Sequence, residues 1–539
     1  MPNAALLKNK HVIVVGAGIG GLVSALLLAH QGVRVTLVES GAAPGGKMRR
    51  IMVGGAPVDS GPTVFTMRWV FEQIFAQAGC NLADLVKLEP LDILCRHAWR
   101  SSDARLDLFT DVARSADAIA QFSSPAEALR FKAFCAKAKA VYHHLERPYI
   151  RSSKPSLMGM GLDLGPAGLA ALASLGPFST LWQSLGKYFH DPRLRQLFGR
   201  YATYCGASPW AAPATLMLIA HVELDGVWSV SGGMHALAKA VADQVAAQGA
   251  TLRYNSPCKR ILVTDGCASG IELDNGEQLH ADAVVFNGDA SALAQGLLGS
   301  GATKAGRVTP LGKRSLSAIT WSVNAKASGF PLVRHNVFFA DDYAREFDQI
   351  FRQHRLPSQG TVYVCAQDRS DAATETDHNE RLLCLVNAPP VGDMNGGQAA
   401  HSSVRNLSDS EIQSCQEQSF NLLGQCGLTL DLASATAHHV RTTPSEFNQL
   451  FPGTGGALYG QASHGWMASF RRPGAASQMK GLFLAGGSVH PGPGVPMAAL
   501  SGQLAAATVM AHLASTKPLG RVRISGGMSM PSATTASTR

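Results

Sequence analysis

Charged residues are scarce in this chain. Only 16% of its 539 residues are Asp, Glu, Lys or Arg, against roughly 25% in typical soluble proteins. Basic residues outnumber acidic ones, 47 to 38, but no block of Lys and Arg with interleaved aromatic residues occurs, so nucleic acid is not an expected partner. A weakly basic surface can instead help to contact an anionic membrane. Hydrophobic residues make up 46% of the chain, enough to bury a large core, which excludes global disorder.

Site motifs built on cysteine, histidine or serine are also missing. None of the ten cysteines forms a CxxC pair, which argues against a zinc site or a disulfide framework and favours a reducing compartment. No HExxH-like spacing links the histidines, so we predict no metal ligands, and packing or exposure is the expected role of each. His490 is the best acid/base candidate because it lies in a glycine-rich segment near the C-terminus. No GxSxG motif supports hydrolase chemistry.

Long apolar runs are absent too. No window of about twenty unbroken apolar residues occurs, so no membrane-spanning helix is expected, and the first ten residues lack the apolar core of a signal peptide. Residues 164–186 form a charge-free run that contains Pro166 and Pro177. Two interpretations stay open for this run: a segment that dips into a membrane, or a buried helix pair broken by the prolines. The run lacks the Lys/Arg-rich polar face that membrane-surface helices favour. The Ser/Thr/Gly-rich residues 516–539 are predicted to be disordered.

The first forty residues are predicted to fold as a βαβ unit. An apolar, β-branched run at 11–15 indicates a buried strand, helix formers follow at 22–32, and 34–39 indicates a second strand. Gly32 gives the helix a natural stop. Farther along, the patterns predict helices at 69–79, 131–146, 234–249 and 496–514, and strands at 251–255, 259–266, 267–276, 282–289, 361–367, 381–388 and 481–487.

The turn of this βαβ unit carries a dinucleotide fingerprint. Gly16, Gly18 and Gly21 fit the pattern GxGxxG. The first glycine permits the tight turn, the second lets the backbone approach a pyrophosphate, and the third lets helix and strand pack closely. The N-terminus of the following helix attracts phosphates, and Glu39 at the end of the second strand can accept hydrogen bonds from ribose hydroxyls.

Two further glycine-rich segments extend the predicted groove. Gly46 and Lys47 come directly after the second strand, where Lys47 can face a phosphate, and VDSGPTVF follows at 58–65. Near the C-terminus, the strand at 481–487 ends in two glycines. Gly494 then precedes a helix whose first N–H groups are free to bind a ligand.

Together these segments resemble the carotenoid (phytoene-type) desaturase family, which belongs to the amine-oxidase-like FAD superfamily. The resemblance rests on GAGIGGL, GGK, DSGPT, GGMHAL and FLAGGSVHPGPGVPMAALSG, and it covers nearly the whole chain before the tail. Within the family, SGPTVFTMRWVF, DGVWSVSGGMHAL, HNVFFADDY and ASHGWMASFRRPG are most similar to the 1-hydroxycarotenoid 3,4-desaturases.

The resemblance implies an α/β fold with two domains. A discontinuous, Rossmann-like FAD-binding domain would use residues 8–115, 227–300 and 475–515. A second, mixed α+β domain at 116–226 and 301–474 would bind the substrate and face the membrane.

FAD is the implied cofactor. The residues that match the family's FAD-binding motifs are Gly16, Gly18, Gly21, Glu39, Gly46, Lys47, Gly61, Pro62, Thr63, Cys258, Gly487, Gly494, Val495, Pro496 and Met497. Two positions depart from the family pattern. Lys47 stands where Arg is frequent, which keeps the positive charge but loses the bidentate fork. Cys258 stands where Val is usual, a change that a backbone contact with the adenine tolerates.

The implied reaction removes two hydrogens from the C3–C4 bond of a 1-hydroxylated acyclic carotenoid such as 1-hydroxyneurosporene. A hydride would pass to flavin N5 and the neighbouring carbon would lose a proton. Because the polyene delocalises positive charge, strong acid or base side chains are not required, and no catalytic side chain is assigned. A polar group near the end of the substrate tunnel is expected to bind the 1-hydroxyl, at a position that the sequence does not locate.

Three alternatives stay open: a phytoene desaturase that acts in several steps, a non-catalytic lipid carrier on the same scaffold, and an amine oxidase, for which substrate-amine features are missing. No second GxGxxG motif is present for a nicotinamide cofactor, so oxygen or a quinone is the expected electron acceptor. An insoluble polyene substrate implies a peripheral or monotopic protein at the cytoplasmic face of a membrane. The sequence predicts no oligomeric state.

Overall fold

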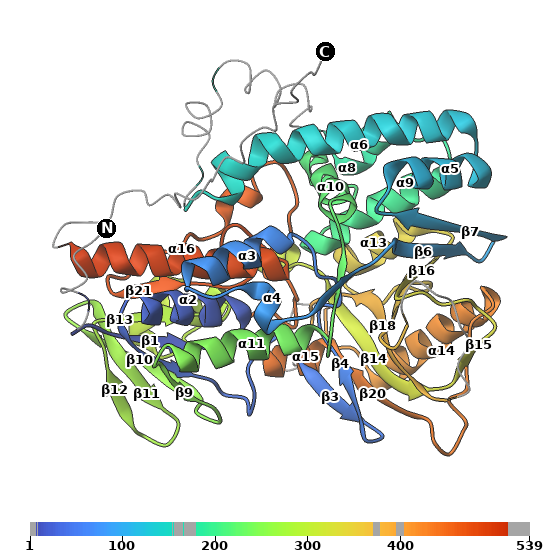
Figure 1. The fold of residues 1–539 in the computed structure, drawn as a ribbon. Coiled ribbons are helices and arrows are strands. Elements are labelled where there is room, and N and C mark those ends of the chain that lie inside the picture. Colours follow the sequence, from blue (N-terminus) through green and yellow to red (C-terminus); the bar gives the residue numbers. More distant parts are fainter. Residues whose placement is uncertain are drawn as a thin grey trace, which may run out of the picture.

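The computed structural model describes residues 9–153, 179–369, 378–394 and 404–515, and residues 7, 155 and 165 individually. Most of the charge-free run at 164–186 and all of 516–539 lie outside the described residues, so the predictions for these segments stay predictions. Two large sheets organise the described part of the chain (Figure 1), and each combines segments that are far apart in the sequence.

A five-stranded parallel sheet joins the two ends of the chain. Its order is β21-β13-β1-β2-β9, with bounds Leu482–Leu484, Ala283–Phe286, His11–Val15, Arg34–Val38 and Thr251–Arg253. Val14 of β1 pairs with Val285 on one side and with Leu37 on the other. Apolar and β-branched side chains fill these strands because both faces of a parallel sheet are covered. As a result, β21 lies only two strands from β1.

The two faces of this sheet are covered differently. Val12 and Val14 pack into a helical layer, whereas Ile13 and Val15 face a three-stranded antiparallel sheet, as the two-residue period of a strand requires. The helices are α2 (Ile19–His30), α3 (Arg68–Gln77), α11 (Met234–Ala247) and α16 (Val495–Ala514). The small sheet consists of β10 (Cys258–Thr264), β11 (Cys267–Leu273) and β12 (Gln278–His280).

Helices α2 and α16 approach so closely that glycine is needed where they meet. A Cβ atom on Gly502 would lie only 2.2 Å from the carbonyl oxygen of Gly20. The hydroxyl of Ser24 lies 2.9 Å from the Gly20 oxygen and 3.0 Å from the Gly502 oxygen, which links the two helices. By length and hydropathy α16 could also cross a membrane, but 61% of its most apolar window is buried inside the protein. Helix α16 is therefore a helix of the protein core.

A seven-stranded mixed sheet forms the second half of the molecule. Its order is β20-β14-β18-β17-β16-β6-β7, with bounds His438–Thr442, Ser317–Ala325, Glu380–Ala388, Val362–Ala366, His335–Phe339, Ile93–Trp99 and Ser102–Phe109. Neighbouring strands are antiparallel, except that β16 and β6 are parallel.

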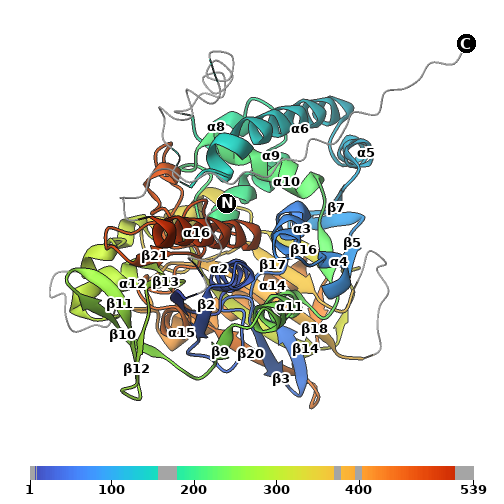
Figure 2. The same cartoon turned by 60° about the vertical axis from the view of Figure 1, so that its left-hand side comes forward.

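Helices cover both faces of this second sheet. One face packs against α5 (Val112–Phe122), α6 (Pro125–Leu145), α8 (Leu181–Leu185), α9 (Pro192–Gly199) and α10 (Leu218–Leu224), which form a layer at the top of Figure 2. The other face packs against α14 (Asp409–Gln425), whose N-terminus is fixed by a capping box between Ser408 and Glu411. A separate small core surrounds α13 (Tyr343–Phe351).

Shorter elements complete the described chain. They are helices α4 (Leu82–Leu85), α12 (Ala290–Ala294) and α15 (Pro444–Leu450), and the strand pairs β3–β4 (Arg50–Val53 and Ala56–Asp59), β5–β8 (Leu88–Pro90 and Trp228–Val230) and β15–β19 (Ala327–Ser328 and Thr429–Leu430).

The predicted elements are confirmed, with bounds that differ by a few residues. For example, the helix predicted at 496–514 is α16, and the strand predicted at 381–388 is β18. The sheets divide the chain differently from the boundary predicted at residue 115, because β6 and β7 pair within the seven-stranded sheet. Sequence pattern could not show this, since β6 finds its partner β16 more than two hundred residues along the chain.

Candidate functional site

One cavity of about 1110 Å³ lies between the two sheets. The carboxyl ends of β1, β2 and β13 reach it through Val15, Val38 and Phe286, which is where parallel α/β sheets bind ligands. The seven-stranded sheet contributes Thr320 and Leu385 from β14 and β18. The cavity therefore has one wall from each half of the molecule.

The first glycine motif forms a tight turn at this cavity. Gly16 has a φ of +101°, in the region that glycine adopts without strain, and its N–H donates to the Val38 oxygen at 2.8 Å. A Cβ atom on Gly21 would lie 2.1 Å from the Gly16 oxygen. Helix α2 can therefore pack this closely on the turn only if residue 21 is glycine. Gly18 is the N-cap of α2 and no side chain caps the helix, which leaves the first N–H groups of the helix for a ligand.

Glu39 and Cys258 lie where β2 and β10 meet the cavity. The Glu39 carboxylate accepts hydrogen bonds from the N–H groups of Ala17 (2.7 Å) and Gly41 (2.8 Å), which fix its position at the end of β2. Cys258 lines the same part of the cavity, and burial raises the pKa of its thiol to about 12, so the thiol stays neutral. Contacts of these residues with ribose and adenine stay predictions.

The second glycine segment packs directly on the first. The Gly45 N–H donates to the Ala17 oxygen at 2.8 Å, and a Cβ atom on Gly46 would lie 3.2 Å from the Cα of Gly18. Gly61 is equally close-packed, against the Lys47 carbonyl oxygen. The sequence motifs GAGIGG, GGK and DSGPT thus form one continuous wall.

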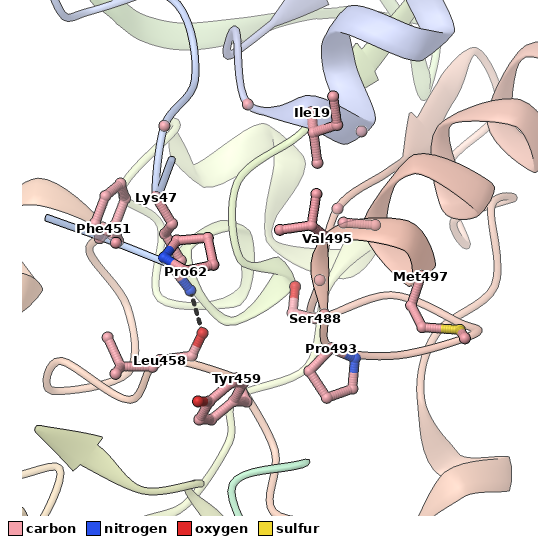
Figure 3. A pocket seen from close by; sticks show the side chains of 18 of the residues that line it. Ile19, Lys47, Pro62, Phe451, Leu458, Tyr459, Ser488, Pro493, Val495 and Met497 are labelled. Atoms are coloured by element: carbon pink, nitrogen blue, oxygen red, sulfur yellow. Dashed lines mark hydrogen bonds between the residues drawn. The ribbon is translucent and has the colours of Figure 1, made fainter. Parts of the chain in front are cut away.

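Lys47 points across the cavity toward the C-terminal half of the chain (Figure 3). Its ammonium donates to the Leu458 carbonyl oxygen and lies 5.4 Å from the ring centre of Phe451. Burial lowers the pKa of Lys47 to about 8, although nearby Asp289 opposes this shift. A contact between Lys47 and a phosphate stays a prediction.

The C-terminal motif forms the opposite side of the same wall. Gly494 is the N-cap of α16, with a φ of +107° and no side-chain cap, and Val495, Pro496 and Met497 line the cavity after it. Figure 3 shows Ile19 of α2 and Val495 of α16 on this side of the cavity. An added Cβ atom on Gly487 would find its nearest neighbour, the Cα of Pro493, 3.9 Å away, an ordinary contact distance that leaves room for the atom.

These features fit a dinucleotide such as FAD. Two uncapped helix N-termini, of α2 and α16, open onto one cavity, and the glycines between them leave the space that phosphates and a ring system require. Asn287 adds an observation that the sequence motifs did not predict. Its Nδ2 donates to the Gly16 oxygen at 3.2 Å, while its buried Oδ1 has no hydrogen-bond partner in the described structure. The sequence signal that could have found it is the Asn-Gly pair at 287–288, which directly follows β13.

His490 packs as expected rather than facing the cavity. Its Nε2 lies 3.0 Å from the Tyr149 carbonyl oxygen, and its ring stands edge-on to the Tyr149 ring. Burial lowers the pKa of His490 to about 4, so the imidazole is neutral near pH 7. Among the residues that the structure describes, no histidine lines the cavity.

Beyond the glycine wall the cavity is mainly apolar. Its aliphatic lining residues come from α6, from α10 and the segments next to these helices, and from β18 of the second sheet. They are Leu145, Ile150, Leu216, Leu218, Ile219, Val222, Leu383 and Leu385. Polar side chains interrupt this lining, among them Thr63, Arg200, Tyr204, Glu223, Thr320 and Tyr363. The cavity thus continues from a dinucleotide site into a long apolar pocket, as binding sites for apolar molecules require.

A family comparison identifies the site. The model of the flavin-containing amine oxidoreductases matches residues 19–510, most of the described chain. The chain belongs to this family. Its cofactor is FAD, and the predicted FAD-binding, amine-oxidase-like fold is confirmed. An oxidoreductase from Methanosarcina mazei has the same fold, with a TM-score of 0.56 and 15% sequence identity over 93% of this chain and 100% of that one.

Curated relatives place the chain among the carotenoid desaturases of this family. It is 60% identical to a hydroxyneurosporene desaturase from Rubrivivax gelatinosus, over 98% of both chains. It is 44% identical to a hydroxyneurosporene desaturase from Cereibacter sphaeroides, over 94% of this chain and 98% of that one. The family resemblance predicted from the sequence motifs is therefore confirmed.

Proposed function

We propose that this protein is an FAD-dependent carotenoid desaturase that forms the C3–C4 double bond of a 1-hydroxylated acyclic carotenoid. The observation that carries the proposal is one continuous cavity, in which a dinucleotide wall continues into an apolar pocket. Hydroxyneurosporene desaturases at 60% and 44% identity support the substrate class. The carrier alternative does not account for the intact glycine wall.

The residues of the chain divide the work between them. The turns at Gly16–Gly21 and Gly494–Met497 would hold the pyrophosphate and the flavin, and Glu39 would hold the adenosine ribose. Bound FAD supplies the hydride acceptor. The aliphatic lining orients the polyene and excludes water from the reacting carbons. Because no histidine of the described chain lines the cavity, proton loss depends on groups other than imidazole.

Product analysis tests this function. The protein is expressed in cells that make 1-hydroxyneurosporene and, separately, in cells that make only phytoene, and the pigments are separated by chromatography. We expect a longer chromophore from the hydroxylated substrate and little change in phytoene. Conversion of phytoene in several steps would favour the phytoene desaturase alternative. An unchanged chromophore in both strains, with flavin-loaded protein present, would contradict the proposal.

Oxygen or a quinone is proposed as the electron acceptor, since the sequence carries no second dinucleotide motif. Peripheral or monotopic attachment to the cytoplasmic face of a membrane is proposed because the substrate resides in lipid. Flotation of the protein with anionic vesicles tests the attachment. Reoxidation of the reduced flavin with air or with a soluble quinone, followed by absorbance, tests the acceptor.

A further inference from the structure

A charged side chain interrupts the apolar half of the cavity. Arg200 starts the 3₁₀ helix Arg200–Cys205, directly after α9, and is half-buried at the cavity wall. Its guanidinium carbon lies 5.4 Å from the ring centres of both Tyr204 and Tyr363, which also line the cavity. A pure hydrocarbon offers this cation no hydrogen-bond acceptor, and burying a charge or polar group without partners is costly. Any Arg200 donor that the protein leaves unpaired therefore favours a substrate that carries a hydrogen-bond acceptor.

The charge of Arg200 is balanced without using up its donors. Glu223 is the opposite charge nearby, but its carboxylate accepts hydrogen bonds from the hydroxyls of Tyr201, at 2.7 Å, and Tyr204. The Tyr204 hydroxyl, which also lies beside the guanidinium, thus links the two charges. A guanidinium has five N–H donors in a fixed fork, so donors remain for a ligand in the cavity.

A second polar group lies next to Arg200, on the cofactor side. The Tyr363 hydroxyl lies 2.6 Å from Thr63 Oγ1 and 2.7 Å from Nδ1 of buried His335. Burial lowers the pKa of His335 to about 3, so this imidazole is neutral. Thr63 directly follows Pro62, which Figure 3 shows on the wall with Lys47. Tyr363 and Thr63 thus lie where the dinucleotide wall meets the apolar pocket.

The chemistry of the proposed substrate requires a polar group at this junction. Four bonds separate the oxygen on C1 from C4, so the oxygen lies at most about 5 Å from C4, given bonds of about 1.5 Å. The C3–C4 bond must lie within contact distance of the hydride acceptor. The hydroxyl therefore lies close to the cofactor wall and not at the remote end of the pocket.

The geometry points to Arg200 and the Tyr363–Thr63 pair as the site that binds the tertiary hydroxyl of the substrate, an inference that rests on the proposed function. Arg200 donates to the hydroxyl oxygen, and the oxygen atoms of the pair accept its hydrogen. The site selects hydroxylated carotenoids, because a hydrocarbon end would leave the remaining Arg200 donors without a partner. It also fixes which carbon–carbon bond reaches the flavin.

Thr320 is the rival candidate. Its hydroxyl is buried at the same cavity and has no hydrogen-bond partner in the described structure. In the sheet, Thr320 pairs with Leu385, and Leu385 pairs with Tyr363 on its other side. Because strands are about 4.8 Å apart, the Cα atoms of Thr320 and Tyr363 are about 10 Å apart. The Tyr363 hydroxyl also bonds to His335 of β16, on the side of β17 that is away from Thr320. Thr320→Val is therefore a control of matched shape.

The test compares two substrates that differ only in the hydroxyl, 1-hydroxyneurosporene and 1,2-dihydroneurosporene, in which hydrogen replaces the hydroxyl on C1. Flavin-loaded wild type, Arg200→Met, Tyr363→Phe and Thr320→Val are mixed anaerobically with each substrate, and bleaching of the flavin absorbance gives an apparent Kd and a reduction rate. Flavin content and thermal unfolding are measured for every variant. We expect the preference for the hydroxylated substrate to fall at least about tenfold in Arg200→Met and severalfold in Tyr363→Phe, and to stay unchanged in Thr320→Val.

The two substrates separate recognition from structure. A purely structural role of Arg200 would lower activity on both substrates by the same factor, and this result would overturn the inference, as would a preference lost only in Thr320→Val. If Arg200→Met fails to bind flavin, Tyr363→Phe decides alone, because removing one hydroxyl keeps the ring and its packing. A wild type that converts neither substrate contradicts the proposed function instead. A wild type that converts the hydroxylated substrate, with variants that keep its preference, contradicts only the hydroxyl site.

Discussion

Replacing Gly21 with alanine tests the wall on which the cofactor assignment depends. The added Cβ atom would lie 2.1 Å from the Gly16 oxygen. Ordinary contact begins near 3.4 Å, so the start of α2 must move by at least about 1.3 Å. The helix cannot recede freely, because Gly20 behind it already touches Gly502 of α16.

The cost of this movement can be bounded. Overpacking of a close-packed site costs about 1–3 kcal/mol, and the better helix propensity of alanine returns up to about 1 kcal/mol. A shift of about 1 Å also breaks hydrogen bonds from the helix N-terminus to a phosphate. Each such bond to a charged group contributes about 1.5–3 kcal/mol. Loss of one bond weakens FAD binding by a factor of about 10–150.

Titration of deflavinated protein with FAD, monitored by flavin fluorescence, measures this loss of affinity. Thermal unfolding at saturating FAD measures the stability. Gly424→Ala is the matched control. Gly424 lies in helix α14, is exposed, and an added Cβ atom there meets nothing within 4 Å. It should raise stability by up to about 1 kcal/mol and leave FAD affinity unchanged. A Gly21→Ala protein that binds FAD with the wild-type Kd would refute the assignment of this turn to the pyrophosphate.

Three further changes test other parts of the molecule. Gly487→Ala should fold normally, since its Cβ atom meets only an ordinary contact at 3.9 Å, yet lower FAD affinity; equal loss of stability and affinity would contradict this. Burial raises the pKa of Glu346 to about 7, so only the unfolded carboxyl ionises between about pH 4.5 and 7, and stability falls as the pH rises through that window, by up to about 3 kcal/mol. Urea denaturation at several pH values should show that the stability of Glu346→Gln does not fall across this window. The same fall with pH in wild type and variant would rule out Glu346 as its source. Glu380→Gln should cost about 3–5 kcal/mol because it leaves Arg369 buried without its carboxylate; a thermal shift near zero would contradict the buried ion pair.

The cofactor side of the site could be predicted from the sequence because its constraints are local. Gly16, Gly18 and Gly21 are fixed by one turn between a strand and a helix, and each glycine has a steric reason that the structure confirms for Gly16 and Gly21. The C-terminal motif could be added because Gly494 also begins a helix. That these segments meet in space was implied by the family resemblance, and the observed strand order β21-β13-β1 confirms it.

The substrate side could not be predicted in this way. Arg200 follows a short helix, and Tyr363 lies in an all-apolar strand, so neither carries a local signal of function. Their meeting depends on β17 pairing with β16 and β18, and on α9 packing on that sheet. The same kind of nonlocal pairing explains why the sheets do not follow the boundary predicted at residue 115, because β6 pairs with β16 in the second sheet.

The segment Ser60–Thr63 connects the two halves of the site, and this connection has a consequence for specificity. The Ser60 hydroxyl lies 2.9 Å from the Ser322 hydroxyl of β14, and Thr63 is tied to Tyr363 of β17. Gly61 between them packs against the Lys47 oxygen in the dinucleotide wall. Because one four-residue segment touches both the seven-stranded sheet and the dinucleotide wall, the distance between the flavin and the hydroxyl site is set by short, direct contacts. A substrate held by its hydroxyl is therefore positioned relative to the cofactor within the tolerance that hydride transfer requires.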